Sequence, residues 1–133
     1  PWPATVLATS LLALGIGGGA LLVGAREDQP SRTIACASAP AGATCQMRVA
    51  DGGAKLVVAG LQPPPEGRIY QVWLDRGGTA PDPTETLFSV RNGRASIAVT
   101  GDLGAVRQVL VTDEPPGGSE APTGRPIIAA RLT

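Results

Sequence analysis

The first 25 residues, from Pro1 to Ala25, carry no charged side chain, and this run ends at Arg26-Glu27-Asp28. At about 1.5 Å of rise per residue, about 22 helical residues span about 33 Å, enough to cross a hydrocarbon core of about 30 Å. A segment inside that core must be helical, because unpaired backbone groups there cost several kcal/mol each. The run therefore predicts a single transmembrane helix over residues 1–25, a juxtamembrane linker over 26–32 and a separate domain over 33–133.

A secretory signal peptide is the alternative interpretation, with the small residues at 23–25 as its cleavage site. We favour the anchor, because the apolar run exceeds the usual signal-peptide core of about 7–15 residues and no basic segment precedes it. Trp2 stands where an interfacial aromatic is expected. Gly15 and Gly19 have the spacing that lets two membrane helices approach closely, so a helix-mediated homodimer is one interpretation. The other is that Gly is simply common in membrane helices.

The composition argues against several functional classes. The net charge is zero and aromatic residues make up only 3%, so the chain has neither the basic field nor the stacking platform that nucleic acid needs. The absence of histidine removes Ser-His-Asp and Cys-His catalysis, histidine-ligated zinc and a blue-copper site. We therefore predict no cofactor, no metal and no enzyme activity. An enzyme that uses carboxylates alone ranks last among the alternatives.

The rest of the chain predicts an all-β domain. It is rich in Gly and Pro, and its apolar runs alternate with turn clusters at close spacing, which is typical of an immunoglobulin-like antiparallel β-sandwich. The pair Asn92-Gly93 favours a type I′ hairpin between the runs at 88–90 and 95–97. The expected strands cover residues 33–37, 44–49, 54–59, 69–74, 86–90, 95–99, 108–112 and 127–132.

Cys36 and Cys45 are the only cysteines, and the residues between them can turn back on themselves. Outside the cytoplasm we expect them to form a disulfide. Closing a loop of this length stabilises a fold by about 2.5–3 kcal/mol in the chain-entropy model. Two unpaired buried thiols are the alternative.

Two segments stand out in the predicted domain. In the strand at 69–75, Trp73 lies on one face and Tyr70 on the other. One interpretation is that both are large core side chains. The other is that the aromatic side chain on one of the two faces stacks on a ligand. The segment at 111–124 reads VTDEPPGGSEAPTG and is a long loop, either structural or a recognition surface. Its Gly-Gly-Ser stretch carries no lysine and opens no helix, so phosphate binding is not expected.

These two segments resemble the C-terminal domain of the anti-sigma-K factor (RskA-type) family, whose hallmark runs read roughly YQLW and VTxEPxGGSxxPTG. The proline-bearing stretch at 60–68 is similar to the family's approach to the YQLW strand, and the likeness covers about residues 33–132. Asp113 departs from the pattern, where an apolar residue is expected, and the two cysteines lie outside the motif. The motif residues that the resemblance marks as structural or recognition positions are Tyr70, Gln71, Trp73, Glu114, Pro115, Gly117, Gly118, Ser119, Pro122 and Thr123.

The resemblance implies a single-pass protein of the bacterial cell membrane with an extracytoplasmic C-terminal domain. In such proteins a cytoplasmic helical domain, absent from these residues, binds an extracytoplasmic-function sigma factor. Stepwise proteolysis by a site-1 and an intramembrane protease then releases it, and the glycines at 15–19 would suit such a cut.

The function predicted for this chain is the extracytoplasmic sensory or regulatory part of a membrane-anchored anti-sigma factor. Its partners would be the lipid bilayer, the two proteases and, through the missing domain, a sigma factor. A redox-sensitive lock at Cys36 and Cys45, close to a cleavage-prone segment at 25–31, is a further hypothesis. The alternative function is a secreted or surface-anchored β-sandwich binding module with no link to transcription.

Overall fold

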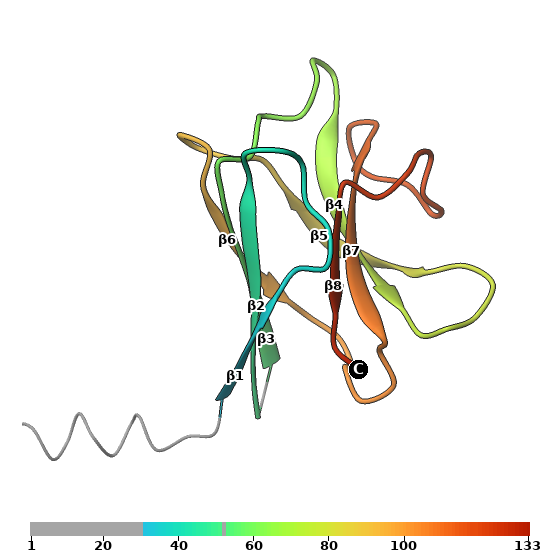
Figure 1. The fold of residues 1–133 in the computed structure, drawn as a ribbon. Coiled ribbons are helices and arrows are strands. Elements are labelled where there is room, and N and C mark those ends of the chain that lie inside the picture. Colours follow the sequence, from blue (N-terminus) through green and yellow to red (C-terminus); the bar gives the residue numbers. More distant parts are fainter. Residues whose placement is uncertain (1–30, 52) are drawn as a thin grey trace, which may run out of the picture. The chain divides into compact units, whose positions relative to one another are not determined.

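The computed structural model describes residues 31–51 and 53–133, which form two four-stranded antiparallel sheets (Figure 1). Sheet A contains, in spatial order, β1 (Ser31–Ala35), β2 (Thr44–Ala50), β3 (Gly53–Ala59) and β6 (Ala95–Val99). Sheet B contains β5 (Asp82–Phe88), β4 (Ile69–Asp75), β7 (Gln108–Glu114) and β8 (Ile128–Arg131). Both sheets contribute to one hydrophobic core, so the expected all-β sandwich is confirmed.

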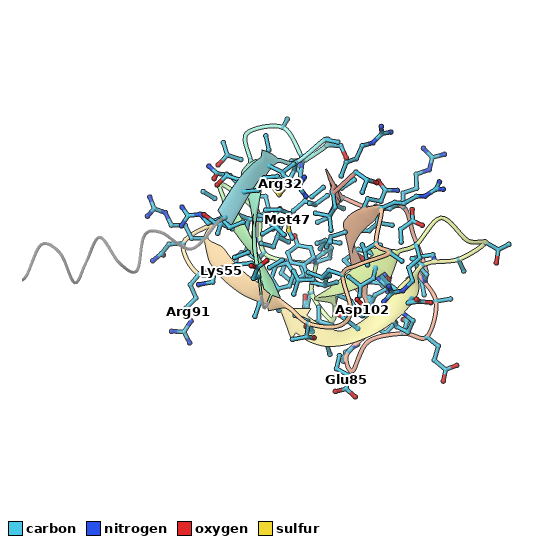
Figure 2. The ribbon with its side chains drawn as sticks, turned by 90° about the horizontal axis from the view of Figure 1, so that it is seen from below. Arg32, Met47, Lys55, Glu85, Arg91 and Asp102 are labelled. Carbon is cyan, nitrogen blue, oxygen red and sulfur yellow. A yellow bond between two sulfur atoms is a disulfide. The ribbon has the colours of Figure 1, made fainter. Side chains whose placement is uncertain are left out.

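The core follows from the alternation of apolar and polar residues along the strands. In sheet A, Met47 and Leu56 are fully buried, whereas their neighbours Arg48 and Lys55 are exposed; Figure 2 shows Met47 inside and Lys55 pointing outward. Sheet A thus buries one face and exposes the other. The central strands of sheet B, β4 and β7, are instead buried on both faces, so a further part of the chain must cover their outer side.

All eight expected strands are present, with shifted ends. β5 runs over Asp82–Phe88 rather than 86–90, and it includes Pro83. Proline cannot donate to a β-ladder, but β5 is an edge strand of sheet B and tolerates it. β1 begins at Ser31, two residues earlier than expected.

The Asn92-Gly93 turn forms, but the predicted hairpin does not extend beyond it. Asn92 has φ 52° and Gly93 has φ 76°, as a type I′ turn requires, and Arg91 and Arg94 exchange two backbone hydrogen bonds across it. The strands on either side then part, since β5 pairs with β4 and β6 pairs with β3. The turn therefore carries the chain from sheet B to sheet A.

Cys36 and Cys45 form the expected disulfide, with their Cα atoms 5.4 Å apart. It closes the loop between β1 and β2, and the amide of Cys36 also donates to the carbonyl of Cys45 at 3.0 Å. The end of β1 is thus fixed covalently to the beginning of β2.

The predicted transmembrane helix at 1–25, its glycine pair and most of the linker lie outside the described residues. Within residues 31–51 and 53–133, no helix has the length and apolar character needed to cross a membrane.

Candidate functional site

The loop after β7, residues 115–124, covers the outer face of sheet B and is called the motif loop below. On that face lie four side chains whose exposed fractions are 2% or less: Gln71 and Trp73 from β4, and Thr112 and Glu114 from β7. Tyr70, Val72 and Leu74 of β4 point to the opposite side, into the sandwich core. Trp73 and Tyr70 are therefore both buried, each in a different layer.

Glu114, the last residue of β7, is fully buried and is the centre of the site. Its Oε1 accepts hydrogen bonds at 2.8 Å from the hydroxyls of both Ser119 and Thr123. The backbone N–H of Thr123 lies 3.2 Å from each carboxylate oxygen, and the hydroxyl of Thr112 donates to Oε2. A single carboxylate thus ties the motif loop to the strand that precedes it.

Burial alone would raise the pKa of Glu114, because desolvation penalises the charged form. The hydrogen bonds from Thr112, Ser119 and Thr123 outweigh burial, so the pKa of Glu114 lies below its usual value. The group is therefore held as a carboxylate at neutral pH.

Trp73 extends this network beneath the loop. Its indole Nε1 donates to the hydroxyl oxygen of Thr112 at 2.8 Å, and Thr112 in turn donates to Glu114. A chain of hydrogen bonds therefore runs from Trp73 through Thr112 to the carboxylate of Glu114, which also accepts from the motif loop.

Gln71 forms a second tie between sheet B and the loop. Its side-chain oxygen accepts the N–H of Ser119 at 2.8 Å, and its amide nitrogen donates to the carbonyl oxygens of Ser119 at 3.1 Å and of Thr84 at 3.3 Å. One side chain thus connects β4, β5 and the motif loop.

The glycines of the motif shape the loop. The N–H of Gly118 donates to the carbonyl of Pro115 at 2.9 Å, and Gly117 and Gly118 have φ of 90° and 85°. These angles favour glycine, and a Cβ at Gly118 would lie 3.0 Å from Oε1 of Gln71. The turn needs Gly at this position for both conformation and space.

The resemblance to the motif did not single out Arg68, which the structure adds to the site. Its Nε donates to Oδ1 of Asp113 at 2.9 Å, and its terminal nitrogen reaches the carbonyl of Asp113 at 2.9 Å and the hydroxyl of Thr123 at 3.2 Å. This pairing explains an acidic residue at position 113, where an apolar one was expected.

Of the predicted site residues, Gln71, Trp73, Glu114, Gly118, Ser119 and Thr123 come together, and Pro115 and Gly117 form the adjoining turn. Tyr70 does not join them. Its ring packs against Phe88 with 5.3 Å between centroids, its hydroxyl donates to the carbonyl of Gln62 at 2.6 Å, and burial, then Asp113, raises its pKa. Pro122 lies in the motif loop and is half-buried.

The site fixes a loop and offers little chemistry. Every polar atom of its buried side chains has a partner among the described residues, and no group of three or more potential metal ligands occurs among them. A hollow of about 430 Å³ adjoins the loop, lined by residues that include Leu87 and Glu120.

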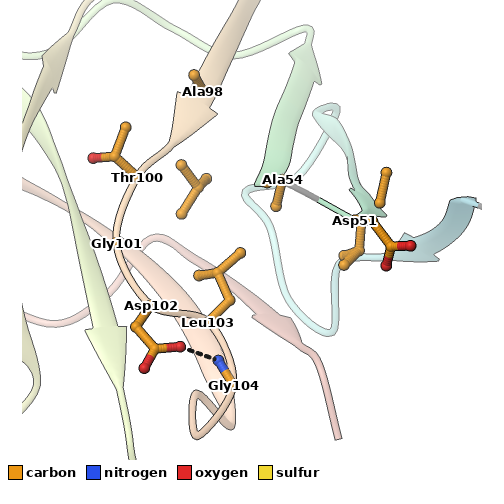
Figure 3. Close-up of a pocket in the computed structure, with 12 residues that line it drawn as sticks. Asp51, Ala54, Ala98, Thr100, Gly101, Asp102, Leu103 and Gly104 are labelled. Carbon is orange, nitrogen blue, oxygen red and sulfur yellow. Dashed lines mark hydrogen bonds between the residues drawn. The ribbon is translucent and has the colours of Figure 1, made fainter.

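A larger hollow of about 790 Å³ lies elsewhere, between the β2–β3 turn and the β6–β7 connection (Figure 3). Small and aliphatic residues line most of it, and the carboxylate of Asp102 there accepts the N–H of Gly104 at 2.9 Å. It contains none of the predicted site residues.

The model of the family described as "Anti-sigma-K factor rskA, C-terminal" matches residues 4–127. Anti-sigma-K factor RskA of Mycobacterium sp. (strain KMS) is 31% identical over 148 residues, which covers 99% of this chain and 60% of that protein. The dysfunctional anti-sigma-K factor RskA of Mycobacterium bovis is 38% identical over 69 residues, 52% of this chain and 30% of that protein.

An uncharacterized protein in the phr 5′ region of Streptomyces griseus is 30% identical over 74 residues, 56% of this chain and 30% of that protein. No solved structure matches. The chain spans about 60% of the length of the mycobacterial relatives that it matches along almost its whole length. It belongs to the family of the anti-sigma-K factor RskA C-terminal region.

Proposed function

We propose that this chain is the extracytoplasmic regulatory part of a membrane-anchored anti-sigma factor. The observation that carries the proposal is the extent of the family match, which begins at residue 4, inside the uncharged run, and continues to residue 127 in the β-sandwich. The run and the sandwich thus belong to one family unit. The support for an anchor over a cleaved leader is the length of the uncharged run, which exceeds the usual signal-peptide core of about 7–15 residues.

Sigma-factor binding is proposed to belong to a segment outside these 133 residues. The mycobacterial RskA relatives are longer, and the chain covers 60% of their length. The motif loop offers few free polar groups for such binding, because the hydroxyl of Ser119 and the carboxylate of Glu114 that it contacts are already paired within the domain. The role that remains for the sandwich is regulation.

The proposed regulation is control of proteolysis near residues 25–31. Four of the five residues of β1 are exposed, so this strand depends on its ladder to β2 rather than on buried apolar contacts. Segments of this kind open at low free energy, and a protease requires an extended, unpaired substrate. Pairing of β1 would protect the chain next to the anchor, and its release would expose that chain.

The Cys36–Cys45 disulfide supports the extracytoplasmic position, because disulfides persist in oxidising compartments. The immunoglobulin-like description is also proposed. Its support is the strand order β2-β3-β6 opposite β5-β4-β7-β8, which corresponds to an A-B-E sheet facing a C′-C-F-G sheet.

The test is to express the protein from its complete gene and capture RNA polymerase sigma subunits from the cells. We expect one sigma factor to co-purify with the membrane fraction and to be lost when the segment upstream of Pro1 is deleted. A control deletion of the sandwich, residues 31–133, should leave capture intact and alter only its regulation. Capture that depends on the sandwich, or no capture at all, would contradict the proposal.

A further inference from the structure

Basic and acidic residues are unevenly distributed between the two sheets of the domain. The segments that build sheet A and its adjoining turns, residues 31–59 and 90–100, contain five basic residues and one acidic residue. The other described segments contain five basic and eight acidic residues. A chain with zero net charge therefore has a basic sheet and an acidic one.

Two cations on the exposed face of sheet A lie directly opposite each other. Arg48 of β2 pairs with Lys55 of β3 in the antiparallel register, and both side chains are exposed. Like charges in such positions destabilise a sheet, and neither cation has an ion pair or side-chain hydrogen bond in the described part of the chain. Two unpaired cations side by side on an exposed face are available to bind an anion from outside the domain.

Two more cations stand at the other end of the same face. Arg91 and Arg94, on the turn before β6, line a shallow apolar hollow together with Val57, Ala59 and Ser96. All four cations are exposed, and Figure 2 shows Lys55 and Arg91 pointing outward on one side of the domain and Glu85 on another. Between the pairs the outward residues of β2, β3 and β6 are small or uncharged, so no acidic side chain of these strands lies among the four cations.

We propose that this face docks on the anionic lipid headgroups of the membrane that anchors the chain, and this inference rests on the proposed function. Arg48 lies opposite Thr33, only two residues, or about 7 Å, along the sheet from Ser31, the first described residue. Residues 26–30 span at most about 18 Å when extended, so the anchor would hold this end of the sheet near the headgroups. A basic face whose four strands carry no acidic side chain fits an array of phosphates, and the one acidic residue of these segments, Asp51, lies in the β2–β3 turn.

The four exposed cations of this face complement the negative charge of phosphate headgroups. Each cation near an anionic membrane surface contributes about a fivefold factor in binding, and the effect decays within about a Debye length, about 8–10 Å at physiological salt. Replacing Arg48 and Lys55 together should therefore shift the docking equilibrium about thirtyfold. Docking would also hold β1 against the surface and so regulate access to the proposed cleavage segment.

The experiment places the full chain in lipid nanodiscs with or without phosphatidylglycerol. A donor fluorophore is attached at Ser96→Cys, an exposed position on the edge strand β6 of this face, and an acceptor is carried on the lipid headgroups. We expect energy transfer to rise when phosphatidylglycerol is present and to fall back in about 1 M salt, where the Debye length is about 3 Å. Arg48→Gln with Lys55→Gln should abolish the rise.

The matched control is Arg125→Gln with Arg131→Gln, which removes the same charge from exposed positions outside sheet A. It should leave the rise intact. The test pair should fold normally, because it removes a repulsion between exposed side chains, and its urea midpoint checks this. Equal transfer in both lipid compositions, or equal loss in the control, would overturn the proposal.

If polyglutamate rather than phosphatidylglycerol changes the signal, the face recognises an acidic polypeptide and the membrane proposal is wrong. A chain that enters neither kind of nanodisc would instead contradict the anchor in the proposed function. In that case, co-sedimentation of the free chain and of the double variant with phosphatidylglycerol vesicles decides the role of the face independently.

Discussion

Glu114→Gln is the substitution that tests the motif site most directly. It keeps the shape of the side chain and removes its charge, while every polar neighbour is a donor: the hydroxyls of Thr112, Ser119 and Thr123 and the N–H of Thr123. The amide nitrogen of glutamine would face at least one of these donors. The remaining bonds would lose the assistance of the charge.

The expected loss follows from the number of bonds. Hydrogen bonds to a charged group contribute about 1.5–3 kcal/mol and neutral ones about 0.5–1.5 kcal/mol, so each of three hydroxyl bonds weakens by about 1 kcal/mol. A neutral amide is easier to bury than a carboxylate, which returns part of this loss. We expect a net destabilisation of about 2–3 kcal/mol, a large fraction of the usual stability of about 5–15 kcal/mol.

Urea unfolding of the full chain in a non-ionic detergent measures this loss. Trp73 reports directly, because its indole donates to Thr112 within the network, and a Trp2→Phe background removes the other tryptophan. A loss of about 2–3 kcal/mol moves the urea midpoint by about 1–2 M. Glu120→Gln, an exposed residue of the same loop, is the control and should change stability by less than about 0.5 kcal/mol.

The pH dependence gives the reasoning a second check. The pKa of Glu114 is lower in the folded chain than in the unfolded one, so its contribution is fully present above the unfolded value of 4.5. It is lost as the pH falls below 4.5 and through the folded pKa. The difference between wild type and Glu114→Gln should therefore be constant near neutral pH and shrink in acid. A Gln variant as stable as wild type at pH 7, or a difference that grows in acid, would refute the account of this site.

Two further substitutions have defined outcomes. Replacing Cys36 and Cys45 with Ser should lower stability by about 2.5–3 kcal/mol in urea and speed tryptic cleavage at Arg32 of β1, because the disulfide fixes the end of that strand; unchanged cleavage would sink the redox-lock hypothesis. Gly118→Ala should cost about 1–2 kcal/mol, because the residue has φ of 85° and a Cβ would meet Gln71, whereas Gly124→Ala meets nothing within 4 Å and should be nearly neutral in the same assay.

The layers of the domain could be predicted from the sequence, because alternation is a local property. The spacing of Met47 and Leu56 among polar neighbours indicates which side of each strand is buried. The start of β5 was less predictable, because proline is not expected inside a strand, yet an edge strand tolerates Pro83. The turn at Asn92-Gly93 was predicted correctly, but whether two strands remain paired beyond a turn depends on what else each can pair with.

The site could be predicted only as a set of residues, not as an arrangement. Gln71 and Ser119 are 48 positions apart, and Arg68 and Asp113 are 45 apart, so no local pattern brings them together. The burial of Glu114 was equally hidden, since a glutamate beside two prolines is typical of an exposed turn. It becomes buried because the loop folds back over the outer face of sheet B and satisfies the carboxylate there.

The register that places Arg48 opposite Lys55 in sheet A can be derived from the burial pattern of the two strands. Grouping residues 51–53 as one turn cluster leaves the register of β2 and β3 open by one residue. If the turn held three residues, Arg48 would lie opposite Leu56, and a side chain that is fully buried would turn toward solvent. A two-residue connection, with Ala50 opposite Gly53, keeps the apolar side chains of both strands inward, and it places Arg48 opposite Lys55. The register of the core thus brings these two positions together, and the sequence places a cation at each of them. Any anion that binds there acts on a charge arrangement that folding creates.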